Sequence, residues 1–82
     1  LRETNEKEAK KFIAYTYGVL TVMDYYIGEI LKAVDRLGYR DNTITIYTSD
    51  HGDLMGEHGM LFKGPSHGMG VFHIPFIWRV PG

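Results

Sequence analysis

The sequence predicts an α/β fold, because one long amphipathic helix is followed by a β-branched strand and, near the end of the 82 residues, by a second strand. From about residue 6 to residue 37, apolar side chains recur every three or four positions, which is the spacing of a helical stripe. Asn5 or Thr4 is the expected N-cap, and Gly38 is the expected stop after the last helical turn.

Two strands are predicted after the helix. Residues 43–48 are β-branched or aromatic at every position, and residues 74–80 form a second strand-like run in which Pro75 suits the beginning of a strand. A helix, a tight turn and a strand in this order indicate an α/β layer, and we expect a parallel sheet. Two strands and one helix cannot cover both faces of such a sheet, so we expect its other strands and helices to lie outside this sequence.

Composition and charge exclude several classes of function. Nine Lys and Arg residues stand against ten Asp and Glu residues, so the formal net charge of −1 gives no field that attracts nucleic acid or an anionic membrane. The absence of cysteine excludes disulfides, thiolate zinc sites and a cysteine nucleophile within these residues. No apolar run reaches the roughly 18 residues that a membrane span requires. We expect a soluble part of a longer protein, and its cellular location stays undetermined.

The chemically active residues gather after the first predicted strand. Asp50 and His51 lie at the carboxyl end of this strand, where ligands of open α/β sheets bind, and Gly52 allows a sharp turn there. A carboxylate and an imidazole are both ligands for divalent metals. A simpler interpretation also stays open, in which Asp50 caps a turn and His51 is a surface side chain.

A single cation and four histidines occupy the second half of the chain. Lys63 is the only Lys or Arg between Arg40 and Arg79, so its ammonium group either balances nearby acids or binds a phosphate-like or sulfate-like anion. Clustered histidines favour metal binding or proton transfer. They are His51, His58, His67 and His73.

Five motifs follow one another along the chain, in the order Ile-Leu-Lys-Ala-Val-Asp-Arg-Leu-Gly, Asp-Asn-Thr-Ile, Tyr-Thr-Ser-Asp-His-Gly-Asp-Leu-Met-Gly-Glu-His-Gly, Lys-Gly-Pro and Ile-Pro-Phe-Ile-Trp-Arg-Val-Pro-Gly. Together, from about Tyr15 to Gly82, they closely resemble the sulfatase family of the alkaline-phosphatase-like superfamily. The resemblance implies a carboxyl-proximal part of a catalytic domain with an α/β/α sandwich fold. Its parts would be a helix at about 6–37, a strand at about 43–48, an active-site loop at 49–73 and a strand at about 74–80.

The resemblance also implies roles for four residues. Asp50 and His51 are the expected ligands of a divalent cation, with Ca²⁺ as the first expectation. Mn²⁺ is the second, because this chain has His51 where many relatives carry Asn, and imidazole suits a softer metal. Lys63 is the expected sulfate-binding and catalytic residue. His67 lies in the region that shapes the substrate pocket and is expected to share both roles. The expected substrate is a small-molecule or carbohydrate sulfate ester.

The family mechanism uses a formylglycine, made from a Cys or Ser in a Cys-x-Pro-x-Arg type of motif, which this sequence lacks. The resemblance therefore implies that the segment is inactive without the rest of the protein, and open sheet edges favour its self-association. Two alternatives stay open. One is a phosphonate monoester hydrolase or phosphodiesterase of the same superfamily, and the other is a non-catalytic metal-binding or partner-binding module.

Overall fold

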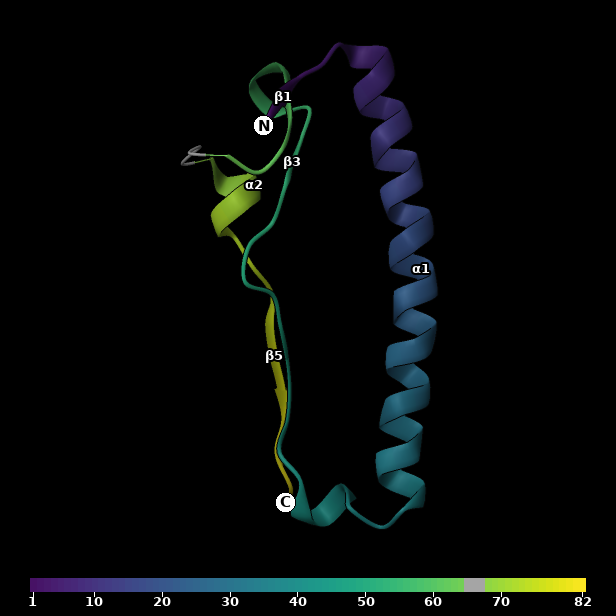
Figure 1. Ribbon diagram of the computed structural model, residues 1–82. Helices are drawn as coiled ribbons and strands as arrows, with labels where there is room; N and C mark the ends of the chain where they lie inside the picture. Colours follow the sequence, from purple (N-terminus) through teal and green to yellow (C-terminus); the bar gives the residue numbers. More distant parts are fainter. Residues whose placement is uncertain (65–67) are drawn as a thin grey trace.

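The computed structural model describes residues 1–64 and 68–82, and it shows one long helix beside a narrow pair of strands (Figure 1). The helix α1 spans Glu6–Arg36, and the two strands are β2 (Thr45–Thr48) and β5 (Phe76–Arg79). The shorter elements are β1 (Arg2–Glu3), η1 (Arg40–Asn42), β3 (Leu54–Met55), η2 (Glu57–Gly59), β4 (Met60–Phe62) and α2 (Met69–Phe72). This mixture of helix and strand is the α/β class that the sequence predicts.

Both ends of α1 are set by local hydrogen bonds. The side chain of Asn5 accepts a hydrogen bond from the backbone N–H of Glu8 at 3.0 Å, which satisfies one of the unpaired donors of the first turn. At the other end, Gly38 adopts a left-handed φ of 79°, and the N–H groups of Gly38 and Tyr39 return to carbonyls of the last turn. This is a Schellman cap, which needs a residue that tolerates positive φ. Asn5 and Gly38 therefore act as the sequence predicts.

The strands β2 and β5 pair with each other in antiparallel orientation, with Thr45 opposite Arg79 and Thr48 opposite Phe76. The expectation of a parallel sheet is wrong for this pair. Parallel neighbours require a crossover that carries the chain back to the end where the first strand began. Here the connection folds up at the end where β2 stops, so β5 begins there and runs back along β2 (Figure 1).

The stretch expected as an active-site loop, residues 49–73, contains regular structure. Its strands β3 and β4 form an antiparallel hairpin, and β4 also pairs with β1, which gives a three-stranded sheet in the order β1-β4-β3. The buried side chains of the described residues come from β3, β4, α2 and the start of α1. They are Ala9, Leu54, Leu61 and Val71. The core of the segment therefore lies at the end of the molecule that carries the candidate site.

At the opposite end, α1 is attached to the strand pair by charge. The carboxylate of Asp35, in the last turn of α1, accepts a hydrogen bond from Arg79 of β5 at 3.0 Å and another from Arg40 of η1 at 3.2 Å. The Asp35 and Arg79 side chains are each about one third exposed, so solvent screens their interaction only in part. This ion pair fixes the far end of the helix against β5.

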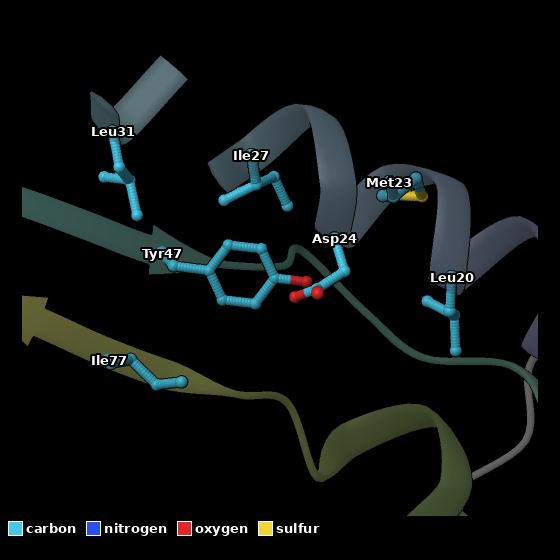
Figure 2. Close-up of a pocket in the computed structure, with 7 residues that line it drawn as sticks. All are labelled: Leu20, Met23, Asp24, Ile27, Leu31, Tyr47 and Ile77. Carbon is cyan, nitrogen blue, oxygen red and sulfur yellow. The ribbon is translucent and has the colours of Figure 1, made fainter. Parts of the chain in front are cut away.

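Between its two ends, α1 is separated from β2 and β5 by an open cleft of about 400 Å³ (Figure 2). The Asp24 carboxylate and the Tyr47 hydroxyl point toward one another in this cleft, whose other walls are apolar. The cleft is lined by Leu20, Met23, Asp24, Ile27, Leu31, Tyr47 and Ile77. Within residues 1–64 and 68–82, no helix combines the length and the apolar character needed to cross a bilayer.

Candidate metal and anion site

The turn after β2 brings a carboxylate and an imidazole together. The Thr48 hydroxyl donates to the carbonyl of Pro75 at 2.9 Å, which holds the end of β2 beside the start of β5. The Ser49 hydroxyl then donates to the His51 carbonyl at 2.7 Å, and Asp50 Oδ1 accepts from the His51 N–H at 2.9 Å. As a result, Asp50 Oδ2 lies 3.7 Å from His51 Nε2. Asp50 therefore caps the turn, as the simpler interpretation expects, while its second carboxylate oxygen lies beside the His51 ring.

The hydrogen bonds of His51 fix the state of its ring. Nδ1 lies 2.8 Å from the carbonyl oxygen of Gly52, and Nε2 lies 2.9 Å from the ammonium nitrogen of Lys63. A carbonyl only accepts and an ammonium only donates, so Nδ1 carries the proton and Nε2 offers its lone pair. A neutral imidazole held by a backbone carbonyl in this way is the usual form of a metal-binding histidine.

Asp50 is available as a charged ligand. Its side chain is 87% exposed. The hydrogen bond from the His51 N–H lowers the pKa of Asp50 below its ordinary value, and the positive charge of Lys63 lowers this pKa further. The carboxylate therefore keeps its negative charge to a lower pH than an isolated aspartate does.

Lys63 reaches this pair from the end of β4. The preceding residue, Phe62, has a left-handed φ of 67°, and its ring packs edge-to-face on Phe12 of α1 with centroids 5.1 Å apart. A left-handed backbone costs a non-glycine residue about 1–2 kcal/mol, so surrounding contacts have to stabilise it.

Gly52 packs directly against the backbone of α2. Its N–H donates to the Val71 carbonyl at 2.8 Å, and a Cβ atom at Gly52 would lie 2.1 Å from the carbonyl oxygen of Gly70. The Glu57 carboxylate accepts from the N–H of Met55 and also lies beside Gly70. The turn that carries Asp50 and His51 is thus fixed against α2 by contacts that only glycine permits.

The donor chemistry fits a divalent cation in part. Asp50 Oδ2 lies 3.7 Å from His51 Nε2, whose lone pair faces the Lys63 ammonium. The described residues contain no group of three or more His, Cys, Asp or Glu side chains that could hold a metal. Hard cations such as Ca²⁺ take six to eight ligands, mainly oxygen, and imidazole is better suited to transition metals. Asp50 and His51 can therefore supply two ligands of a larger coordination shell.

The sulfatase family model matches residues 2–82. The chain belongs to the sulfatase family. An arylsulfatase of Clostridium perfringens is 40% identical over 78 residues, which cover 95% of this sulfatase chain and 16% of that protein. Arylsulfatase K of Canis lupus familiaris is 39% identical over 77 residues, which are 94% of this chain and 14% of that protein.

Iduronate 2-sulfatase of Homo sapiens is 36% identical over 66 residues, covering 80% of this chain and 12% of that protein. The sulfatase chain therefore spans 16% or less of the length of these relatives. No solved structure gives a significant match.

The structure of the sulfatase chain brings together three of the four predicted site residues: Asp50, His51 and Lys63. His67 lies outside the described residues. His58 is an exposed left-handed residue of η2 (φ 56°), and the exposed His73 directly follows α2. The roles of these residues in metal and sulfate binding stay predictions.

Sequence reasoning missed two features of the site. The first is the contact of Gly52 with Gly70, for which the glycine spacing at 68–70 was a visible signal. The second is the left-handed backbone of Phe62. Nothing in the sequence pointed to it, because a bulky aromatic residue rarely adopts positive φ.

Replacing Gly52 by Ala in the full-length sulfatase is expected to destabilise the fold by about 1–3 kcal/mol, the usual cost of overpacking. The new Cβ would meet the Gly70 carbonyl oxygen at 2.1 Å, so the turn or α2 has to move. Thermal unfolding measures the effect. Gly70→Ala is the matched control, because its nearest atom is the flexible end of Glu57 at 2.9 Å. A Gly52→Ala protein that unfolds at the wild-type temperature would contradict this packing.

Proposed function

We propose that the full-length protein is a sulfuric ester hydrolase, and that this segment supplies two metal ligands and one sulfate-binding cation. The observation that supports this most is the 2.9 Å contact between Lys63 Nζ and His51 Nε2, beside the Asp50 carboxylate. The single cation of an otherwise acidic stretch contacts the proposed metal-binding pair and not a distant acid. An anion at this position would meet the ammonium of Lys63 and a metal held by Asp50 and His51.

Each residue has a defined part in this proposal. A bound divalent cation, Ca²⁺ or else Mn²⁺, would polarise an oxygen of the sulfate group. Asp50 and His51 would hold that cation once the Lys63 ammonium, which here donates to the His51 Nε2 lone pair at 2.9 Å, turns to the sulfate group. The Gly52 carbonyl keeps the proton on Nδ1, so that Nε2 is the nitrogen left for the metal. Lys63 binds the sulfate oxygens and stabilises the negative charge that develops as the S–O bond breaks. His67 is proposed to line the substrate pocket.

The nucleophile is proposed to come from outside this segment. The sulfatase family uses a formylglycine, and the 82 residues contain neither a cysteine nor a Ser-x-Pro-x-Arg sequence that could be its precursor. The names of the relatives point to aryl or carbohydrate sulfate esters as the class of substrate. A formylglycine motif upstream of Leu1 in the full-length protein would support both parts of the proposal.

The full-length protein is expected to hydrolyse an aryl sulfate in a metal-dependent manner, whereas the 82-residue chain alone shows no turnover above background. Activity of the full-length protein should disappear with a chelator and return with Ca²⁺ or Mn²⁺. Initial rates with aryl sulfate and aryl phosphate, measured side by side, test the reaction class.

Faster turnover of the phosphate ester would replace the proposal with a phosphoester hydrolase. Turnover by the isolated chain would show that the roles are assigned wrongly. Tight metal uptake by the isolated chain in calorimetry, with no ester hydrolysis by the full-length protein, would identify a binding module.

A further inference from the structure

The strand β4 ends in an unusual backbone conformation, directly before the proposed sulfate-binding residue. Among the described residues other than glycine, positive φ occurs at His58 and Phe62. Histidine is enriched in this region of φ and ψ, but a bulky aromatic residue is an outlier there. Backbone outliers that the surrounding structure holds in place are concentrated at functional sites.

The conformation of Phe62 changes the direction of the chain at Lys63. In an extended strand, side chains two positions apart share a face, so a continuous β4 would place Lys63 on the face of Leu61. Leu61 is 2% exposed, which makes that face the buried one. The left-handed residue between them breaks the alternation, and Lys63 is exposed with its ammonium 2.9 Å from His51 Nε2.

The ring of Phe62 is held by α1. It packs on Phe12 at an interplanar angle of 85° and a centroid distance of 5.1 Å, the edge-to-face geometry that aromatic pairs favour. Phe12 lies three positions after the buried Ala9, so both residues belong to the face of α1 that packs on the small sheet. The backbone of Phe62 is fixed as well, because Phe62 pairs with Leu54 of β3.

We propose that Phe62 is a positioning residue, whose ring contact with Phe12 holds the left-handed backbone that directs Lys63 toward the anion site. This inference rests on the proposed function of Lys63. It assigns a role in sulfate binding to an aromatic pair that need not contact the substrate, and it couples the first turns of α1 to the site.

Calorimetry of the metal-loaded full-length protein with inorganic sulfate tests the inference. Phe62→Gly keeps the left-handed backbone accessible and removes the ring, and it is expected to weaken sulfate binding about tenfold, the scale of one aromatic pair. The KM for an aryl sulfate should rise in parallel, while the affinity for the metal stays unchanged because Asp50 and His51 are intact. Phe12→Leu should weaken sulfate binding in the same direction, and Phe12→Tyr, which keeps the ring, should retain it.

The decisive measurement is a double-mutant cycle. In a Lys63→Met background, Phe62→Gly is expected to change sulfate affinity by less than about twofold, because residues that act through one another are not additive. An equal loss with and without Lys63 would show a merely structural role and overturn the inference, as would wild-type affinity in Phe62→Gly. If Lys63→Met alone binds sulfate normally, the proposed function falls with it. If Phe62→Gly does not fold, Phe12→Leu in the same cycle decides.

Discussion

Replacement of Lys63 by Met in the full-length sulfatase is expected to lower kcat/KM for an aryl sulfate by about 10²–10³-fold, the usual cost of removing one group that stabilises transition-state charge. Methionine is similar in length and apolar, so the variant removes the ammonium group and keeps most of the packing. The loss should exceed the loss in sulfate affinity, because negative charge grows on the ester as the S–O bond breaks. Steady-state kinetics with metal content measured in parallel give the result.

Two variants make this test specific. Lys63→Arg keeps the charge in a larger, planar group, so it should retain part of the activity. Lys32→Met removes an exposed ammonium of α1 that lies 2.7 Å from Glu29, a surface ion pair of little energetic weight, and it should leave kcat/KM within about twofold of wild type. Equal activity of the Lys63→Met and Lys32→Met proteins would show that Lys63 takes no part in catalysis.

Replacement of Asp50 by Asn is expected to weaken binding of the divalent cation by more than about 100-fold. Losing a residue that only hydrogen-bonds to a metal ligand costs up to about 100-fold in metal affinity, and Asp50 is proposed to be a ligand itself. Asn keeps the shape of the side chain and removes the negative charge through which Asp50 is proposed to bind the cation. Calorimetry or competition with a chelating dye measures the affinity. Activity should fall at limiting metal and recover in part when metal is in excess.

Asp53→Asn is the matched control, because Asp53 is an exposed aspartate of the same turn region. If the Asp50 and Asp53 variants lose metal affinity equally, general electrostatics and not ligation would explain the effect. His51 provides a second test of ligation. His51→Ala should lose affinity, whereas His51→Asn supplies an oxygen donor and should favour Ca²⁺ over Mn²⁺.

The sequence predicted those features that depend on neighbouring residues. Asn5 and Gly38 mark the ends of α1 because each completes hydrogen bonds within one turn of the helix. Asp50 and His51 could be singled out because, after Ser49, they follow a β-branched strand, and their role in metal binding stays a prediction. Lys63 stood out as the single cation of its stretch, and the structure then placed its ammonium at His51.

The remaining features depend on contacts between distant residues. The direction of β5 relative to β2 follows from how residues 49–64 and 68–75 fold at one end of the pair, and strand composition does not report this. The hairpin of β3 and β4 is too short to show an alternating pattern, so the stretch read as a loop. The positive φ of Phe62 depends on Phe12, 50 positions earlier, and has no local signature.

The attachment of α1 at its two ends has a mechanical consequence. One end packs through Ala9 and Phe12 on the hairpin beside the site, the other is tied through Asp35 to Arg79, and the middle stands away from the strands. Because α1 is held at both ends, it resists tilting relative to the strands when side chains fill the cleft beside its middle. Neighbouring parts of the full-length protein can therefore place side chains in the cleft beside the middle of α1 without changing the spacing of the Lys63 ammonium, the His51 imidazole and the Asp50 carboxylate.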